Sequence, residues 1–103
     1  MADGRWAELT FFEQMANIGS EVIRALKWRE KGKPDYASAA ADRALELLWL
    51  TIDDPRNRDR LKKLCRLYEY LADYFYCDNA YSTEPQKLRN YCFAFNYAAR
   101  LRS

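Results

Sequence analysis

The residues with the clearest chemical potential are the cations that follow Pro55. From Arg56 to Arg66 the chain carries six basic side chains and one acid, Asp59. A guanidinium presents a planar fork of donors that matches phosphate oxygens, so clustered Arg and Lys are typical of surfaces that bind nucleic-acid backbones. The sequence therefore predicts a site for RNA or DNA phosphates. Its predicted members are Arg56, Arg58, Arg60, Lys62, Lys63, Arg66, Arg100 and Arg102.

Charge is distributed unevenly along the chain. Residues 1–53 carry a net charge of −2 and residues 54–103 a net charge of +4, which together give +2. In an antiparallel bundle the loop between the second and third helices lies at the same end as both termini, so Arg5 and the C-terminal arginines are expected near the loop. The alternative is a solvated loop that only keeps the protein soluble, because +2 is a low net charge for a dedicated nucleic-acid binder.

A second group of cations lies near the end of the first predicted helix, at the opposite end of the bundle. Its members are Arg24, Lys27, Arg29, Lys31 and Lys33. Cations suit the negative end of a helix dipole, and Asp35, Asp78 and Glu84 are expected nearby. Ion pairing and helix capping therefore account for this second group.

Catalytic and metal chemistry are limited by the absence of His. His is the usual general base near neutral pH, and Ser and Cys nucleophiles normally depend on one. The three cysteines form no C-x-x-C pair and are expected to be reduced thiols, with Cys65 and Cys92 in or near the core. The chain is therefore not expected to be an enzyme or to bind a cofactor or a metal ion. A site driven by Lys or a carboxylate is the remaining enzymatic alternative.

The elements that must position these residues are helices. In LKKLCRLYEYLADYFY, apolar residues recur at steps of three and four, which is the period of one helix face. Similar patterns predict helices over residues 6–31, 36–52, 58–76 and 84–101, with Asp35 as an N-cap and Gly32 ending the first helix. Asp54 and Pro55 predict a short turn before the third helix, and Thr83 with Gln86 a capping box before the fourth. Short linkers then predict an all-α, up-down-up-down four-helix bundle that forms a single domain over residues 1–103.

The second predicted helix carries more apolar surface than a monomeric bundle needs. Its segment ALELLWLTI is apolar nearly all round, which indicates a homo-oligomer interface. The predicted interface residues are Leu45, Trp49, Leu50, Tyr70 and Tyr74. The alternative is that Trp49 or Leu50 simply covers a neighbouring helix of the same chain.

The location is predicted from apolar runs. No run approaches the ~20 residues that a membrane span requires. The N-terminus MADGRWAEL lacks the continuous apolar stretch of a signal peptide. A cytoplasmic protein with no membrane partner is therefore expected.

The chain as a whole resembles a known family of small bundle proteins. About a hundred residues, four predicted helices, no catalytic constellation and a basic second half resemble the accessory variability determinant proteins, which are encoded beside reverse transcriptases of diversity-generating retroelements. The third helix and the tail from Arg100 to Arg102 carry most of this likeness. The chain is similar in the same way to the S23-type bundle proteins of unknown function. The resemblance implies a ring-forming bundle whose partners are a reverse transcriptase and nucleic acid. The HEPN ribonucleases, another helical family, are excluded because their Arg-to-His motif needs His.

Together these observations predict a non-enzymatic accessory or adaptor protein. It would self-associate and bind nucleic acid and a protein partner through its basic end. The competing hypothesis is a scaffold that binds only proteins, in an unknown pathway.

Overall fold

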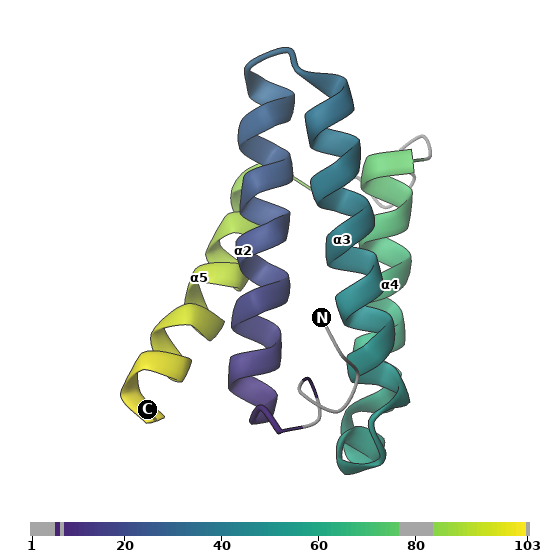
Figure 1. Ribbon diagram of the computed structural model, residues 1–103, viewed down its shortest axis with the longest axis vertical. Coiled ribbons are helices and arrows are strands. Elements are labelled where there is room, and N and C mark those ends of the chain that lie inside the picture. Colours follow the sequence, from purple (N-terminus) through teal and green to yellow (C-terminus); the bar gives the residue numbers. More distant parts are fainter. Residues whose placement is uncertain (1–5, 7, 77–83, 103) are drawn as a thin grey trace.

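Antiparallel helices make up nearly all of the described chain in the computed structural model. The structure describes residue 6 and residues 8–76 and 84–102, with side chains as far as Ala94. Its elements are α2 (Phe11–Glu30), α3 (Pro34–Asp53), the 3₁₀-helix η1 (Pro55–Arg60), α4 (Leu61–Tyr76) and α5 (Pro85–Arg102). Successive long helices run in opposite directions (Figure 1). The prediction of an all-α, up-down-up-down four-helix bundle is confirmed.

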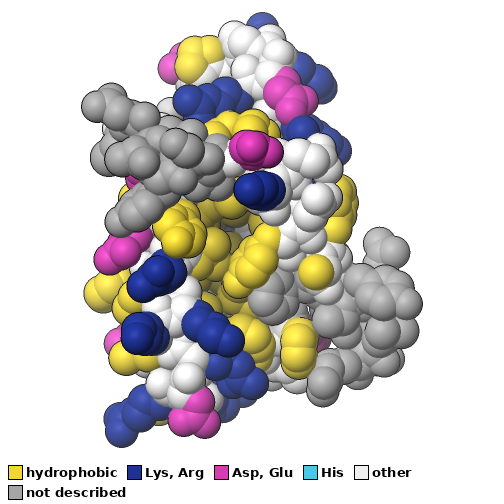
Figure 2. Space-filling model, turned by 180° about the vertical axis from the view of Figure 1, so that it is seen from behind, with side chains coloured by type: hydrophobic (Ala, Val, Ile, Leu, Met, Phe, Trp, Pro, Cys, Tyr) yellow, Lys and Arg dark blue, Asp and Glu magenta, His cyan; other side chains and the backbone are white. Residues whose placement is uncertain are grey.

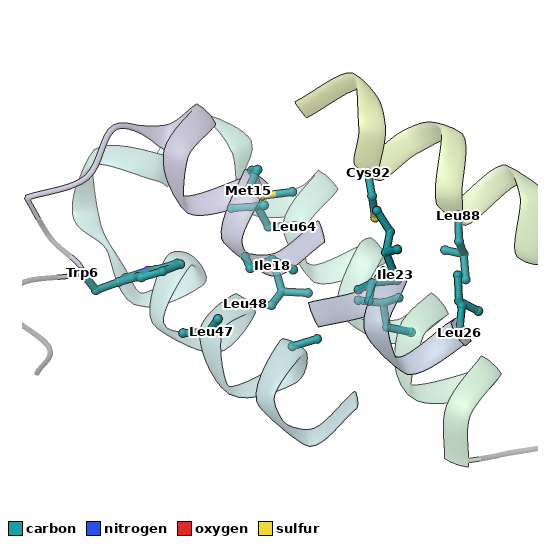
Figure 3. Packing of buried hydrophobic residues seen from close by; sticks show 13 residues of the cluster. Trp6, Met15, Ile18, Ile23, Leu26, Leu47, Leu48, Leu64, Leu88 and Cys92 are labelled. Atoms are coloured by element: carbon teal, nitrogen blue, oxygen red, sulfur yellow. The ribbon is translucent and has the colours of Figure 1, made fainter. Parts of the chain in front are cut away.

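Helix α2 lies at the centre of the arrangement. It packs against α3 on one side and α5 on the other, while α4 packs against α3 (Figure 1). Figure 3 shows Leu26 beside Leu88, and Ile23 beside Cys92, where α2 meets α5. Helices α3 and α5 thus bury the apolar residues of α2, which recur with the period of three and four that the sequence shows. The buried members from α2 are Met15, Ile18, Val22, Ile23, Ala25 and Leu26.

The closest approach of two helices is at Gly19. A Cβ built on this residue would lie 3.0 Å from the Cβ of Cys92 and 3.4 Å from its Cα, which is tighter than ordinary van der Waals contact. The absence of a side chain at Gly19 therefore lets α5 lie directly on α2.

The start of α2 differs from the sequence prediction. Helix α2 begins at Phe11, not at Trp6, because Thr10 forms a capping box: its hydroxyl accepts from the Glu13 N–H and the Glu13 carboxylate accepts from the Thr10 N–H. Before this cap, the Leu9 N–H donates to the Trp6 carbonyl in a turn. Trp6 is consequently free to fold back into the core, where it is 2% exposed.

The turn between α2 and α3 is compact. Gly32 has a φ of 72° and closes α2 in a Schellman motif, with its N–H on the Arg29 carbonyl and the Lys33 N–H on the Trp28 carbonyl. Gly32 is thus confirmed as the residue that ends the helix. The predicted N-cap at Asp35 is wrong, since α3 begins at Pro34 with Lys33 as a cap that makes no side-chain hydrogen bond. Proline suits the first helical position, where its missing N–H costs nothing.

The remaining boundaries follow proline. Asp54 caps η1 by accepting from the Arg56 N–H, as the Asp-Pro pair predicts, so the regular third helix begins at Leu61 and not at residue 58. Helix α5 begins at Pro85 and extends to Arg102. The predicted cap at Thr83 lies outside the described residues. Within the described chain, no helix is both long and apolar enough to cross a membrane.

Candidate nucleic-acid interface

Residues that come before the basic run fix its position. The side chain of Asp54 is nearly buried and accepts hydrogen bonds from Arg56 and Gln14. The Arg56 guanidinium binds it through Nε at 3.1 Å and Nη2 at 2.7 Å, and Nη2 also donates to the Leu9 carbonyl at 2.9 Å. Hydrogen bonds from Arg56 hold the pKa of Asp54 well below its usual range, and the same pair raises the pKa of Arg56.

Arg56 therefore has a structural role that its sequence position does not reveal. Its donors join the chain before α2 to the turn after α3, although its side chain is 50% exposed. We retain Arg56 as part of the basic end, but its guanidinium already binds a carboxylate and a carbonyl. A phosphate would have to compete with both.

A buried polar network continues from Asp54 into the bundle. Gln14 Nε2 donates to Asp54 and to the Trp6 carbonyl, and Asn57 Nδ2 donates to Gln14 Oε1 and to the Thr51 carbonyl. Trp6 Nε1 donates to the Thr51 hydroxyl, which donates to the Leu47 carbonyl. Every fully buried side-chain N or O among the described residues has a hydrogen-bond partner. The network ties η1 to α2 and α3 and so fixes the loop that carries the cations.

Four of the predicted cations form one exposed surface, which we call the basic face. Its members are Arg58, Lys62, Lys63 and Arg66. They make no ion pair with any described residue and lie on η1 and the first turns of α4. In Figure 2 Lys and Arg side chains gather at this end of the molecule. Arg60 is exposed beside them, with its guanidinium 4.2 Å from the centre of the Phe11 ring.

The C-terminal arginines are not shown to join the basic face. The backbone of α5 reaches Arg102, and its C-terminal end lies at the same end of the bundle as η1 but on the other side of α2 (Figure 1). The side chains of Arg100 and Arg102 lie outside the described part, as does Arg5. Their predicted place in one patch with Arg58 stays a prediction.

A groove between α4 and α5 adjoins the basic face; we call it the α4–α5 groove. It has a volume of about 290 Å³ and is mostly apolar. Leu67 and Tyr70 of α4 and Leu88 and Tyr91 of α5 line it, and Figure 2 shows hydrophobic side chains in the hollow between the two helices. Its cationic edges are Lys63, Arg66 and Lys87. Sequence analysis did not predict this groove, because it depends on where α5 lies on α2.

The predicted interface residues divide into two kinds. Leu45, Leu50 and Tyr74 are partly buried and pack against the core of their own chain, so they cover neighbouring helices. Trp49 is 60% exposed and touches the edge of Tyr68 at a ring-centre distance of 6.4 Å. Tyr70 is half-buried in the α4–α5 groove. Trp49 is thus an exposed large side chain of α3, in ring contact with the edge of Tyr68.

The second group of cations surrounds an aromatic pair. Trp28 and Tyr36 stack with ring centres 4.8 Å apart, and the Lys31 ammonium lies 5.3 Å from the centre of the Trp28 ring. Among the described residues this group forms no ion pair with the expected acids Asp35 and Glu84, and Asp78 lies outside that part of the chain. Arg24 pairs instead with Glu21. This surface is a shallow hollow of about 530 Å³ on α2 and α3.

Cysteine placement corrects one prediction. Cys65 is exposed, because it lies about 100° around α4 from Leu64, which faces the core. Leu61, on the same side, is also 40% exposed, although the pattern placed it on the apolar stripe. Cys92 is buried as predicted, and burial raises the pKa of its thiol to about 12. Among the described residues no three Cys, Asp or Glu side chains are grouped so as to hold a metal ion.

Comparison with family models, curated proteins and solved structures finds no match to this chain. The described residues form a small antiparallel helical bundle that carries exposed cations at both ends.

Proposed function

We propose that this chain is a non-enzymatic adaptor that binds the phosphate backbone of a nucleic acid through its basic face. The observation that carries the proposal is the position of Lys62 and Lys63 in the first turn of α4, where the structure has no acid. The N-terminal end of a helix is the positive end of its dipole, so acids stabilise it and cations do not.

Repulsion between like charges on α4 also lowers the stability of this helix. Lys62 and Arg66 are separated by four residues and Lys63 and Arg66 by three, so their like charges are neighbours on one helix face. Each such pair destabilises a helix by about 0.2–0.5 kcal/mol. Phosphates bound across this face would neutralise both terms, whereas charges that served only solubility would gain nothing from this position.

The proposal includes a protein partner. The resemblance to accessory proteins of diversity-generating retroelements implies a reverse transcriptase, which would share the nucleic acid with this chain. A scaffold without a nucleic-acid role is the competing function, and it predicts that the basic face has no effect on RNA or DNA affinity.

The test uses a fluorescent single-stranded RNA of about 20 nucleotides and measures its anisotropy against protein concentration. The double variant Arg58→Ala with Lys62→Ala removes two cations of the basic face that do not line the α4–α5 groove. It should weaken binding severalfold and reduce the salt dependence, log K against log[salt], by about 1.4.

The matched control is Lys27→Ala with Lys31→Ala, which removes the same charge from the surface around Trp28. We expect this control to bind as the wild type does. Equal affinity of the Arg58 and Lys62 variant and the wild type would refute the proposal. A larger loss in the control would transfer the binding site to the opposite end of the bundle and refute it as well.

A further inference from the structure

The α4–α5 groove has the chemistry of a receptor for an apolar side chain flanked by acids. Its floor and walls are apolar, and cations stand on both helices that border it: Lys63 and Arg66 on α4, and Lys87 on α5. Its volume is at the small end of the roughly 300–1,000 Å³ of ligand pockets, which suits one large side chain.

The exposed face of α3 that adjoins α4 presents a segment of matching chemistry. Trp49 is 60% exposed. Asp42 lies seven residues before it, Glu46 three residues before it, and Asp53 four residues after it. These spacings place all four side chains on one helix face. All three acids are exposed, although Glu46 pairs with Arg43 and Asp42 accepts a hydrogen bond from Tyr76. We call this set the acidic Trp49 stripe.

The stripe and the groove lie on opposite sides of α4. Tyr68 contacts Trp49, and the Tyr76 hydroxyl donates to Asp42, so this side of α4 faces the stripe. Tyr70 lines the groove and lies about 200° around the helix from Tyr68. Within one copy of the chain, the stripe therefore cannot reach the groove.

We propose that the acidic Trp49 stripe of one copy docks into the α4–α5 groove of a second copy. Trp49 enters between Tyr70 and Tyr91, and the acids of the stripe face the cations at the edges of the groove. Trp, Tyr and Arg are the residue types that dominate the energetics of protein interfaces. The contact joins two different surfaces, so it is heterologous, and each copy keeps one free stripe or groove for a further copy.

This inference is tested separately from the proposed function, although Lys63 and Arg66 belong both to the basic face and to the edge of the groove. Arg58 and Lys62 take no part in the contact, so loss of RNA binding in their variant would leave the assembly unchanged. Failure of the assembly would likewise leave the RNA test intact.

The first measurement is the mass of the wild type by light scattering on a sizing column, from about 1 to 100 µM, after nuclease treatment. A mass above the monomer that falls as salt rises is expected, because the edges of the interface are charged. A wild type that stays monomeric at the highest concentration would overturn the proposal.

The variants then assign the two halves of the contact. Trp49→Glu and Lys63→Glu with Lys87→Glu should each give helical monomers. Mixed together they should form a dimer and nothing larger, because the first retains an intact groove and the second an intact stripe. A mixture that stays monomeric would overturn the heterologous contact.

Tyr36→Glu is the matched control for Trp49→Glu. Tyr36 also lies on α3 and is 59% exposed, but it lies outside the stripe. The control should retain the mass of the wild type. If Trp49→Glu loses its helical circular dichroism, Glu46→Lys replaces it; an unchanged mass for Glu46→Lys would then contradict the proposal.

Discussion

The Asp54 carboxylate allows the sharpest prediction about stability. In the variant Asp54→Ala, η1 loses its N-cap, which is worth about 1 kcal/mol. The charge-assisted hydrogen bonds from Arg56 are lost as well, and hydrogen bonds to charged groups are worth about 1.5–3 kcal/mol. The destabilisation is smaller than the sum of these losses for two reasons. Water can hydrate the freed Arg56 guanidinium, because this side chain is 50% exposed. Gln14 also keeps its hydrogen bond to the Trp6 carbonyl. We expect the free energy of unfolding to fall by about 2–4 kcal/mol at pH 7.

The pH dependence of this effect has a definite sign. The folded pKa of Asp54 is depressed, whereas the unfolded pKa is about 3.9. Below pH 4 the unfolded chain takes up a proton that the folded chain does not, so the stabilisation by Asp54 is lost at about 1.4 kcal/mol per pH unit. The gap in stability between the wild type and Asp54→Ala should therefore narrow as the pH falls from 5 to 2.

Urea unfolding followed by circular dichroism at several pH values measures both quantities. Asp59→Ala is the matched control, since Asp59 is an exposed carboxylate of the same loop. It should change stability by less than about 0.5 kcal/mol. A loss below about 1 kcal/mol for Asp54→Ala, or a gap that stays constant down to pH 2, would refute the role given to the pair with Arg56.

Three further predictions concern contacts elsewhere in the bundle. Gly19→Val should lower the free energy of unfolding by about 1–3 kcal/mol in a urea titration, because the new side chain would push α5 off α2; a gain in stability would contradict the close approach. In the variant Cys77→Ala, a thiol reagent should label Cys65 at once and Cys92 only when the chain unfolds, because Cys92 is buried and burial raises the pKa of its thiol to about 12. Prompt labelling of both thiols would contradict the burial of Cys92. Partial burial and the hydrogen bond to Asp42 raise the pKa of Tyr76 to about 12, so Tyr76→Phe should remove a late-ionising phenol from an alkaline absorbance titration; loss of a phenol that ionises near pH 10 would contradict this assignment.

Much of the fold is readable from the sequence, because helix periodicity and core burial have the same cause. Leu64 and Leu71 recur at the helix spacing and are buried where that spacing places them. The start of α2 was missed although its signal is local: Thr10 and Glu13 have the spacing of a capping box. The apolar pattern begins earlier, at Trp6, and the prediction followed that pattern instead of the capping box.

The site is less predictable, because its parts meet only in the folded chain. Gln14 and Asn57 look like surface residues in sequence, and they become a buried pair only when α2 and η1 pack together. Arg56 belongs to the basic run by its position in the sequence, but its bond to Asp54 depends on the geometry of η1. The α4–α5 groove depends on the contact of Gly19 with Cys92, which no local pattern specifies. The apolar excess on α3 did not distinguish Trp49, which is exposed, from Leu45 and Leu50, which pack on the core.

The most direct test of the central claim is the salt dependence of RNA binding by the wild-type chain. If Arg58, Lys62, Lys63 and Arg66 each contact a phosphate, log K should fall against log[salt] with a slope of about −3, at roughly 0.7 per contact. The account predicts that slope, and its decrease when Arg58 and Lys62 are removed. A slope near zero, or no measurable binding at about 50 mM salt, would show that the basic face serves solubility alone.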